Sequence, residues 1–335
     1  MRRRITLCLV FILFVLTSCQ STSDQANSKS KNEMTDQSDE QSSSQESYKL
    51  SYKGQTFHII YLDQAVLEFA NLVKEDSSLD REKIYNEKVI HTFQELASQN
   101  EVKIGTGYLD YFSSRTNIGK LKENAIKVSE QKENINEAVK KAIHKSVNRL
   151  SGGDKTLFIK PLNPDEYDAI YKMEGVAGVA FSEDAILLEI DPSYKEDMLT
   201  YTVAHEYLHT VEREKGNGEK YSVLDLIVGE GKADAFAHMV YPEKQVPWAK
   251  PLSEPSQKKA FDQLRSYIYS YDYHVYAAFV NGNPQKGIPQ WASYKLGGKI
   301  TQSYLDKHPD ESVDEWVKHK GREFLQGSAY RDLLH

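Results

Sequence analysis

The sequence has 335 residues, of which 39% are hydrophobic, and its formal net charge is −7. This length and apolar content suffice for the core of one large domain or two modest ones, and the negative charge argues against nucleic acid as a partner. The two cysteines, Cys8 and Cys19, both lie in the first 19 residues, which excludes a disulfide within the remainder of the chain.

The chain begins with the features of a bacterial secretion signal. Residues 2–4 are arginines, and the apolar run over residues 5–16 is too short to span a hydrocarbon core of ~30 Å. The sequence Leu16-Thr17-Ser18-Cys19 follows and resembles the bacterial lipobox. The resemblance implies removal of a signal peptide, residues 1–18, and attachment of a lipid to Cys19. We therefore expect a protein anchored to the cell membrane on its extracytoplasmic side. An ordinary secretion signal with a chance cysteine is the alternative.

A polar segment follows the predicted lipid anchor. Between residues 20 and 47, Ala26 and Met34 are the only apolar residues, and no aromatic residue occurs. Such a composition cannot bury enough surface to offset the conformational entropy that is lost on folding. We expect residues 19–47 to form a disordered tether.

The folded part is expected to begin with a hairpin. Residues 48–62 contain two alternating segments on either side of Lys53-Gly54. Residues 64–100 and 118–150 carry apolar residues at helical spacing among many charged ones, which predicts two or three amphipathic helices. We expect residues 48–155 to form an N-terminal subdomain that walls a cleft.

Short strands are predicted over residues 156–159, 176–181 and 185–190, the last two joined as an antiparallel pair. A long helix is predicted next. Ser193 and Glu196 have the spacing of a capping box, so the helix should start there and continue to about Glu214.

This helix contains the motif His205-Glu206-Tyr207-Leu208-His209. Histidines at i and i+4 lie on one helical face, where both imidazoles can reach one zinc ion at about 2.0–2.1 Å. The glutamate between them can take a proton from a water molecule at the metal, so Glu206 is the candidate general base. The alternative is a pair of surface histidines without a metal.

A second helix is predicted over residues 223–240, before Pro242, and it contains the sequence Gly229-Glu230-Gly231-Lys232-Ala233-Asp234. Catalytic zinc takes three protein ligands and an open position, and Glu230 is the candidate third ligand. Asp234, one turn later, can accept the second N–H of a liganding histidine, although it can also be a solvated charge. Two glycines inside a helix cost about 1 kcal/mol each relative to alanine, which indicates close approach of another backbone.

These motifs resemble those of gluzincin metallopeptidases, and more specifically those of the bacterial family described as predicted zinc-dependent proteases. The resemblance extends over residues 175–304 and includes a downstream tyrosine and glycine motif over residues 289–297. It implies an α+β fold with a gluzincin-like (thermolysin-like) core over residues 156–335. That core would have a small antiparallel sheet and the HExxH helix, and the chain would be mostly helical elsewhere. It also implies Zn²⁺ as cofactor and a peptide or protein substrate, which we expect to add to the strand over residues 185–190 as the edge of the sheet.

The sequence also allows other assignments of the ligands and donors to be compared. The metzincin pattern requires Gly and His where Glu212 and Lys215 stand, so it does not fit. His238 is two turns beyond Glu230, about 12 Å along the helix, and is expected to be structural or part of the cleft wall. Tyr294, then His274, and also Tyr221 are the candidate donors for a developing oxyanion, although packing explains each of them equally well.

The sequence therefore predicts a membrane-anchored zinc peptidase. A surface lipoprotein that binds zinc or a peptide without hydrolysis remains the first alternative. The second is an adhesion or assembly factor with a structural metal, which would show a fourth protein ligand. The substrate, the cleavage specificity and the oligomeric state cannot be read from the sequence.

Overall fold

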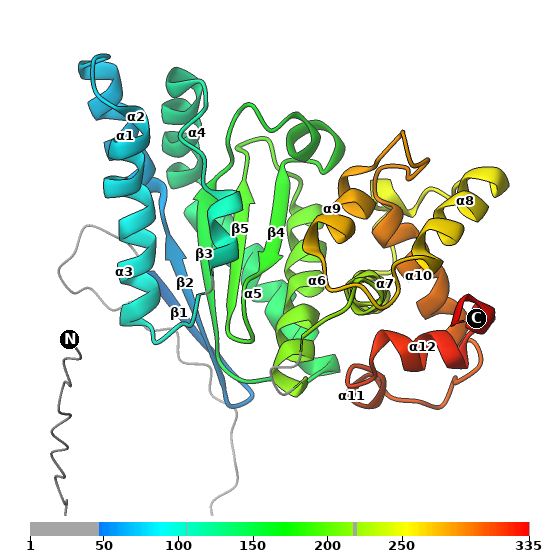
Figure 1. The fold of residues 1–335 in the computed structure, drawn as a ribbon. Coiled ribbons are helices and arrows are strands. Elements are labelled where there is room, and N and C mark those ends of the chain that lie inside the picture. Colours follow the sequence, from blue (N-terminus) through cyan, green and yellow to red (C-terminus); the bar gives the residue numbers. More distant parts are fainter. Residues whose placement is uncertain (1–46, 105, 217–219, 335) are drawn as a thin grey trace, which may run out of the picture. The chain divides into compact units, whose positions relative to one another are not determined.

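The computed structural model describes residues 47–104, 106–216 and 220–334 (Figure 1). The predicted signal peptide, the predicted lipidation site Cys19 and all but the last residue of the predicted tether lie outside the described residues. Within the described part, no helix combines the length and the apolar character that crossing a membrane requires.

The centre of the fold is a five-stranded sheet in the order β1-β2-β3-β5-β4. Its strands are β1 (Ser47–Tyr52), β2 (Gln55–Tyr61), β3 (Lys155–Pro161), β4 (Val176–Ala180) and β5 (Ala185–Ile190). The β1–β2 and β4–β5 pairs are antiparallel, whereas β2–β3 and β3–β5 are parallel. The predicted α+β class is confirmed, but the sheet is mixed rather than antiparallel. The long helical connection between β2 and β3 brings the chain back in the same direction, as parallel strands require.

The predicted hairpin at the start of the fold is confirmed. Lys53 and Gly54 have φ values of 49° and 79°, the left-handed conformations that a two-residue hairpin turn needs. The hairpin places β1 at one edge of the sheet and β2 next to β3. Strands from residues 48–155 and from residues 156–335 therefore share one sheet.

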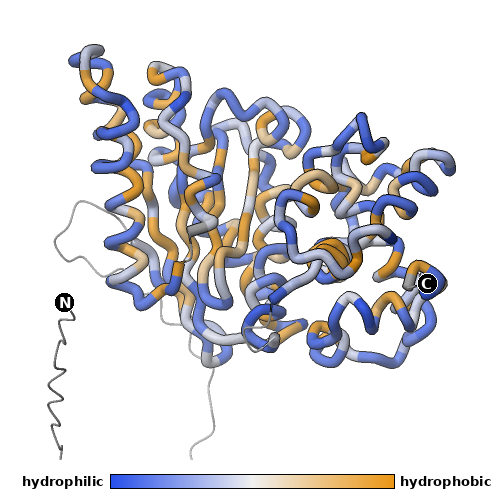
Figure 2. Tube along the Cα trace, in the orientation of Figure 1, coloured by the Kyte–Doolittle hydropathy of each residue, from blue (hydrophilic) through white to orange (hydrophobic). Residues whose placement is uncertain are grey.

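Helices cover both faces of this sheet (Figure 1). One face packs against α1 (Asp63–Glu75), α3 (His91–Gln99) and α4 (Ile118–Glu130), and the other against α5 (Lys132–Arg149) and α6 (Glu196–Lys215). The short helix α2 (Arg81–Tyr85) and a π-helical turn (Asn86–Ile90) lead into α3. Successive residues of β5 alternate between the two cores, as the pleat requires: Leu187 belongs to the first, Ile186 and Leu188 to the second. Strands β3 and β5 accordingly contain continuous apolar runs, at residues 157–159 and 185–188 (Figure 2).

The helix that contains the HExxH motif starts later than predicted. Its N-cap is Lys195, which makes no capping hydrogen bond through its side chain. The predicted capping box at Ser193 is wrong, because Ser193 donates from its backbone N and its Oγ to Asp191 Oδ1 in the preceding turn. The helix then continues to Lys215, close to the predicted end.

The second predicted helix is confirmed as α7 (Val223–Val240), which begins with a capping box at Ser222. It packs against α6 and α10 (Ala292–Leu305), and the remaining helices complete this side of the fold. They are α8 (Glu254–Arg265), α9 (Tyr273–Asn281), α11 (Val313–Trp316) and α12 (Gly321–Gly327).

Two glycines allow α7 and α10 to pack backbone to backbone. A methyl group at Gly231 would overlap the carbonyl group of Gly297, and one at Gly297 would overlap the carbonyl oxygen of Ile227. The expectation that another backbone approaches the Gly-Glu-Gly segment is therefore confirmed. The same contact explains Gly297, the glycine of the downstream motif. Helix α10 also brings Tyr294 to the region of Glu230.

Candidate metal centre

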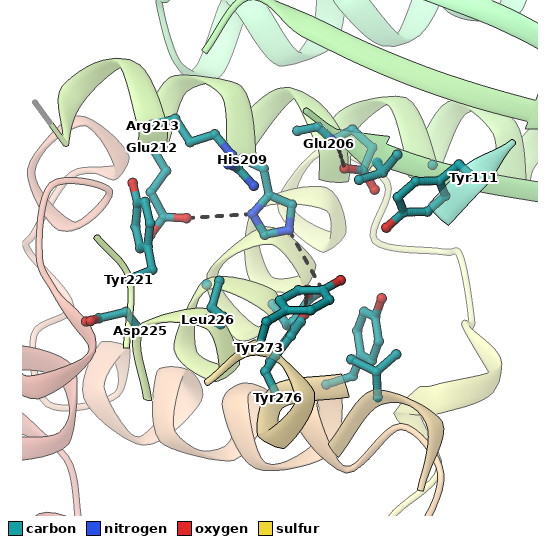
Figure 3. Close-up of a pocket in the computed structure, with 17 residues that line it drawn as sticks. Tyr111, Glu206, His209, Glu212, Arg213, Tyr221, Asp225, Leu226, Tyr273 and Tyr276 are labelled. Carbon is teal, nitrogen blue, oxygen red and sulfur yellow. Dashed lines mark hydrogen bonds and ion pairs between the residues drawn. The ribbon is translucent and has the colours of Figure 1, made fainter. Parts of the chain in front are cut away.

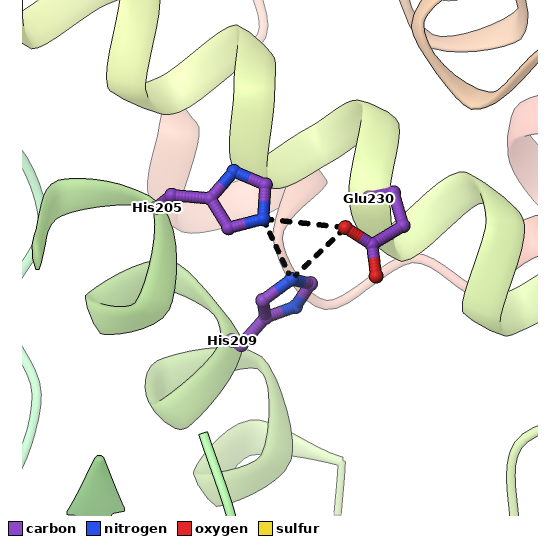
Figure 4. A group of neighbouring side chains, drawn as sticks. All are labelled: His205, His209 and Glu230. Carbon is purple, nitrogen blue, oxygen red and sulfur yellow. Dashed lines mark hydrogen bonds and ion pairs between the residues drawn. The ribbon is translucent and has the colours of Figure 1, made fainter. Parts of the chain in front are cut away.

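Side chains of His205, His209 and Glu230 converge between α6 and α7 (Figure 4). His205 Nε2 lies 3.2 Å from His209 Nε2 and 3.3 Å from Glu230 Oε2, and His209 Nε2 lies 3.8 Å from the same oxygen. Ligand atoms at 2.0–2.2 Å from a tetrahedral zinc ion are roughly 3.3–3.6 Å apart. The three donors therefore fit the ligand set of a zinc ion, with one position left open.

Asp234 fixes the orientation of the first histidine. Its Oδ1 lies 3.1 Å from His205 Nδ1, so it can accept that proton and leave Nε2 directed toward Glu230. Tyr201 Oη donates to Asp234 Oδ1 at 3.0 Å, and Trp248 Nε1 donates to Oδ2 at 2.8 Å. Asp234 is thus held by two donors of its own.

A second carboxylate, which the sequence analysis did not assign, faces the other histidine. Glu212 Oε2 lies 3.6 Å from His209 Nδ1 (Figure 3). The other oxygen of Glu212 forms an ion pair with Lys232. Lys232 is only 1% exposed and also donates to the carbonyl oxygens of Val317 and His319, each at 3.0 Å. Burial disfavours the charge of Glu212, but Lys232 and His209 together outweigh burial and lower the pKa of Glu212 to about 2.

The sequence gives some indication of both contacts of Glu212, the one with His209 and the one with Lys232. Glu212 follows His209 by three residues, so the two share a helical face. Lys232 lies in a helix with little polar surface, where a lysine needs a buried partner. The sequence therefore indicates that Lys232 has an acidic partner, and the structure identifies that partner as Glu212.

Electrostatics at the centre favour a cation. Burial lowers the pKa of both histidines, but Asp234 and Glu230 raise that of His205 well above its usual value, and Glu212 and Glu230 raise that of His209 to about 9. Burial disfavours the charged form of Glu230, but the two histidines outweigh burial and hold the pKa of Glu230 far below its usual value. Carboxylates that stabilise protons on these rings also stabilise a metal ion placed between them.

Glu206 lies beside this centre, under strand β4. The residue is 6% exposed, and its carboxylate accepts a hydrogen bond from the backbone N–H of Ala180 at 2.8 Å. Burial raises the pKa of Glu206, and the neighbouring histidines oppose the rise. A Cβ at Gly178 would lie 2.8 Å from Glu206 Cγ, so a glycine is required where β4 crosses α6.

The open edge of the sheet next to the centre is β4. The prediction that the strand over residues 185–190 forms this edge is wrong, because β5 pairs with both β3 and β4. Phe181 N–H donates to Ala185 O, and hydrogen bonding alternates along an antiparallel pair. The backbone groups of Ala180 and Gly178 therefore face away from β5, on the side where Ala180 meets Glu206.

A cavity of about 180 Å³ opens on this centre and is rich in tyrosine (Figure 3). Tyr276 Oη donates to Glu230 Oε1 at 2.5 Å, so it holds the oxygen that does not face the histidines. Burial raises the pKa of Tyr276 and of Tyr294 well above the usual value, so both phenols stay protonated and can donate. The tyrosines that line the cavity are Tyr111, Tyr221, Tyr273, Tyr276 and Tyr294.

The predicted oxyanion donors differ in whether they line the cavity. Tyr294 and Tyr221 line the cavity, whereas His274 does not. His274 is exposed at the start of α9, where its backbone N–H donates to Asp272. The neighbouring residues Tyr273 and Tyr276 line the cavity instead. His238 is exposed as well and lines a separate cavity behind Asp234.

Residues 135–326, more than half of the chain, match the family described as "Predicted Zn-dependent protease (DUF2268)". The chain belongs to this family. In this family member the match begins within α5 and ends within α12, so it includes every residue of the candidate metal centre. Tyr111, the hairpin and helices α1 to α4 precede the match. No curated protein and no solved structure gives a significant match to the chain.

Proposed function

We propose that the protein is a zinc-dependent peptidase of the gluzincin type. The observation that carries the proposal is the convergence of His205, His209 and Glu230 at a spacing that suits zinc, next to Glu206 and an open cavity. Bound zinc would act as a Lewis acid toward the scissile carbonyl and would lower the pKa of a water molecule beside it. The family description supports the same class of reaction.

In this proposal Glu206 moves the proton. A general base is most effective when its pKa lies near the working pH, and burial shifts the pKa of Glu206 in that direction. The hydrogen bond from Ala180 holds one carboxylate oxygen and leaves the other available. Glu206 would take a proton from the attacking water and deliver it to the leaving amine as the peptide C–N bond breaks.

The substrate would lie along β4. An extended peptide can add to an open sheet edge by main-chain hydrogen bonds, and the backbone of Gly178 faces that edge. Tyr294 is the better candidate for the donor to the carbonyl oxygen as negative charge develops there. Its hydroxyl makes no hydrogen bond to any described residue, whereas the proton of Tyr276 is already given to Glu230.

The proposal includes the location and organisation that the sequence predicts. Residues 1–18 would be removed as a signal peptide, Cys19 would carry the lipid, and residues 19–47 would hold the enzyme away from the extracytoplasmic face of the membrane. Residues 48–155 would serve as a wall of the cleft, and residues 156–335 as the peptidase core. Tyr111 supports the wall role, since it lines the cavity from the N-terminal part.

A protein that binds zinc or a peptide without hydrolysis is the alternative. It would not need Glu206, and a purely structural zinc site would usually have four protein ligands. Among the described residues, the group of candidate ligands has three members. Both points favour the peptidase.

The test is cleavage of a peptide library, read by mass spectrometry. Zinc-loaded protein should cleave peptides, and Glu206→Gln should keep its zinc but lose about 10²–10⁴-fold in rate. Glu183→Gln, on the exposed loop between β4 and β5, is the matched control and should behave as wild type. Full activity in Glu206→Gln, or activity after complete removal of metal, would contradict the proposal. Zinc and peptide binding without any cleavage would support the alternative.

A further inference from the structure

One cation that lines the cavity forms no ion pair with any residue that the structure describes. Arg213 follows His209 by four residues and lies on the same face of α6 as His205 and His209. It lines the same cavity as His209 and Glu230, and Figure 3 shows its side chain extending along the helix toward His209. Within the described part of the chain, the guanidinium forms neither an ion pair nor a hydrogen bond.

The acidic residues that line the cavity are committed to other partners. Glu212 is neutralised by Lys232, and Asp225 accepts from the backbone N and Oγ of Ser222 and from the backbone N of Gly321. Glu206 and Glu230 belong to the metal centre. Arg213 is therefore not paired with any of these carboxylates, and its guanidinium is available to a group that enters the cavity.

A guanidinium in this position suits a carboxylate. Arginine offers paired N–H donors in a planar fork, which match the two oxygens of a carboxylate better than a lysine would. Four residues of helix correspond to about 6 Å along the axis, and an extended peptide rises about 3.3 Å per residue. Because the Arg213 side chain extends toward His209, a carboxylate held by Arg213 would lie within about two residues of a carbonyl group positioned near His209.

We propose that Arg213 is a specificity-determining residue that binds a substrate carboxylate close to the scissile bond. This inference rests on the proposed peptidase function and deepens it. The carboxylate can come from the C-terminus of a peptide or from an Asp or Glu side chain. In the first case the enzyme removes short C-terminal fragments, and in the second it cleaves within acidic sequences.

The experiment compares matched peptides on zinc-loaded full-length protein. In the first pair, one peptide ends in a free C-terminal carboxylate and the other in a C-terminal amide. In the second set, all peptides have amidated C-termini, and each pair has Glu or Gln at one of three positions on either side of the cleaved bond. The readout is the ratio of kcat/KM within each pair. Binding of the same peptides to Glu206→Gln protein, measured by calorimetry, gives a parallel ratio that does not depend on turnover.

Wild type should favour the carboxylate in one pair by about tenfold or more, the value expected for a charge-assisted hydrogen bond. Arg213→Gln should bring that ratio close to one, and Arg213→Lys should retain part of it. Arg149→Gln, an exposed arginine on α5, is the matched control and should keep the wild-type ratio. Because each ratio compares two peptides on one variant, a general loss of activity cancels.

The pair that shows the preference identifies the source of the carboxylate. Cleavage with no preference in any pair, or a preference that survives in Arg213→Gln, overturns the inference while the peptidase function stands. A carboxylate preference in binding that Arg213→Gln abolishes, together with no cleavage by wild type, supports the role of Arg213 and refutes the peptidase function.

Discussion

Replacing Lys232 by methionine tests whether the buried network around His209 supports the metal site. Lys232 is buried, neutralises Glu212, whose side chain is only 12% exposed, and donates to the carbonyl oxygens of Val317 and His319. Methionine fills a similar volume but leaves the Glu212 carboxylate without a cation. Removing one partner of a buried ion pair costs about 3–5 kcal/mol, so we expect a loss of that size in the free energy of unfolding.

The double variant Lys232→Met/Glu212→Gln separates stability from metal binding. Since no uncompensated charge remains in the interior, most of the lost free energy of unfolding should return. Zinc affinity should stay about 10–100-fold below that of wild type, because His209 Nδ1 no longer faces a carboxylate. Stability is measured by urea unfolding of metal-free protein, and zinc affinity by competition with a chromophoric chelator.

Lys258→Met is the control for this experiment. Lys258 pairs with Asp262 on the surface of α8, and its side chain is 82% exposed, so neither stability nor zinc affinity should change measurably. The reasoning is refuted if the double variant binds zinc as tightly as wild type. In that case Glu212 would have no influence on the orientation of His209.

Three further predictions concern the tyrosines, the helix contact and the response to acid. Tyr276→Phe should weaken zinc binding about 10–100-fold in a chelator competition, because Tyr276 donates to Glu230. Tyr294→Phe should lower kcat about 10²–10³-fold and leave zinc affinity unchanged. If the two variants changed zinc affinity and kcat alike, these separate roles would be contradicted. Gly231→Ala should lower the free energy of unfolding by about 1–3 kcal/mol, because the added methyl group would overlap the backbone of α10. Gly298→Ala is the control in the same helix pair and should not lower it, because the space around Gly298 is open. Similar free energies of unfolding for the two variants would refute the α7–α10 contact. Burial opposes the charge of Glu214, but the hydrogen bond from Gly153 and the charge of Lys155 lower its pKa, so its contribution to stability is present above pH 4.5 and lost as the pH falls. The difference in Tm between wild type and Glu214→Gln should therefore narrow on acidification, and a constant difference would count against this ion pair.

The sequence predicts well those features that depend on neighbouring residues. The hairpin at Lys53-Gly54, the bounds of α7 and the antiparallel β4–β5 pair follow from turn chemistry and periodicity. The spacing within α6 places the two histidines on one face. The cost of glycine in a helix correctly indicates that a backbone approaches Gly231.

Features that depend on distant segments are the ones the sequence does not reveal. The parallel pairing of β3 is decided by its neighbours β2 and β5, so neither the mixed sheet nor the edge position of β4 follows from local pattern. The partner of Lys232 lies on another helix. Tyr111 reaches the cavity from about a hundred residues upstream of Glu206, and nothing in its local sequence indicates that contact.

The capping-box error at Ser193 has a local cause. In a capping box the carboxylate of Glu196 would accept from the backbone N–H of Ser193, but Asp191 Oδ1 accepts from this N–H instead, and the helix starts after the resulting turn. A local turn therefore replaces the capping box, although residues of the right types stand at the right spacing.

The central claim is that His205, His209 and Glu230 together hold one zinc ion, and metal analysis of purified protein tests it most directly. Wild type that has been loaded with zinc and freed of excess metal should contain one equivalent per chain. His205→Ala and Glu230→Ala, folded by circular dichroism, should contain far less after the same treatment. Wild type without zinc, or full retention of zinc in either variant, would contradict the account.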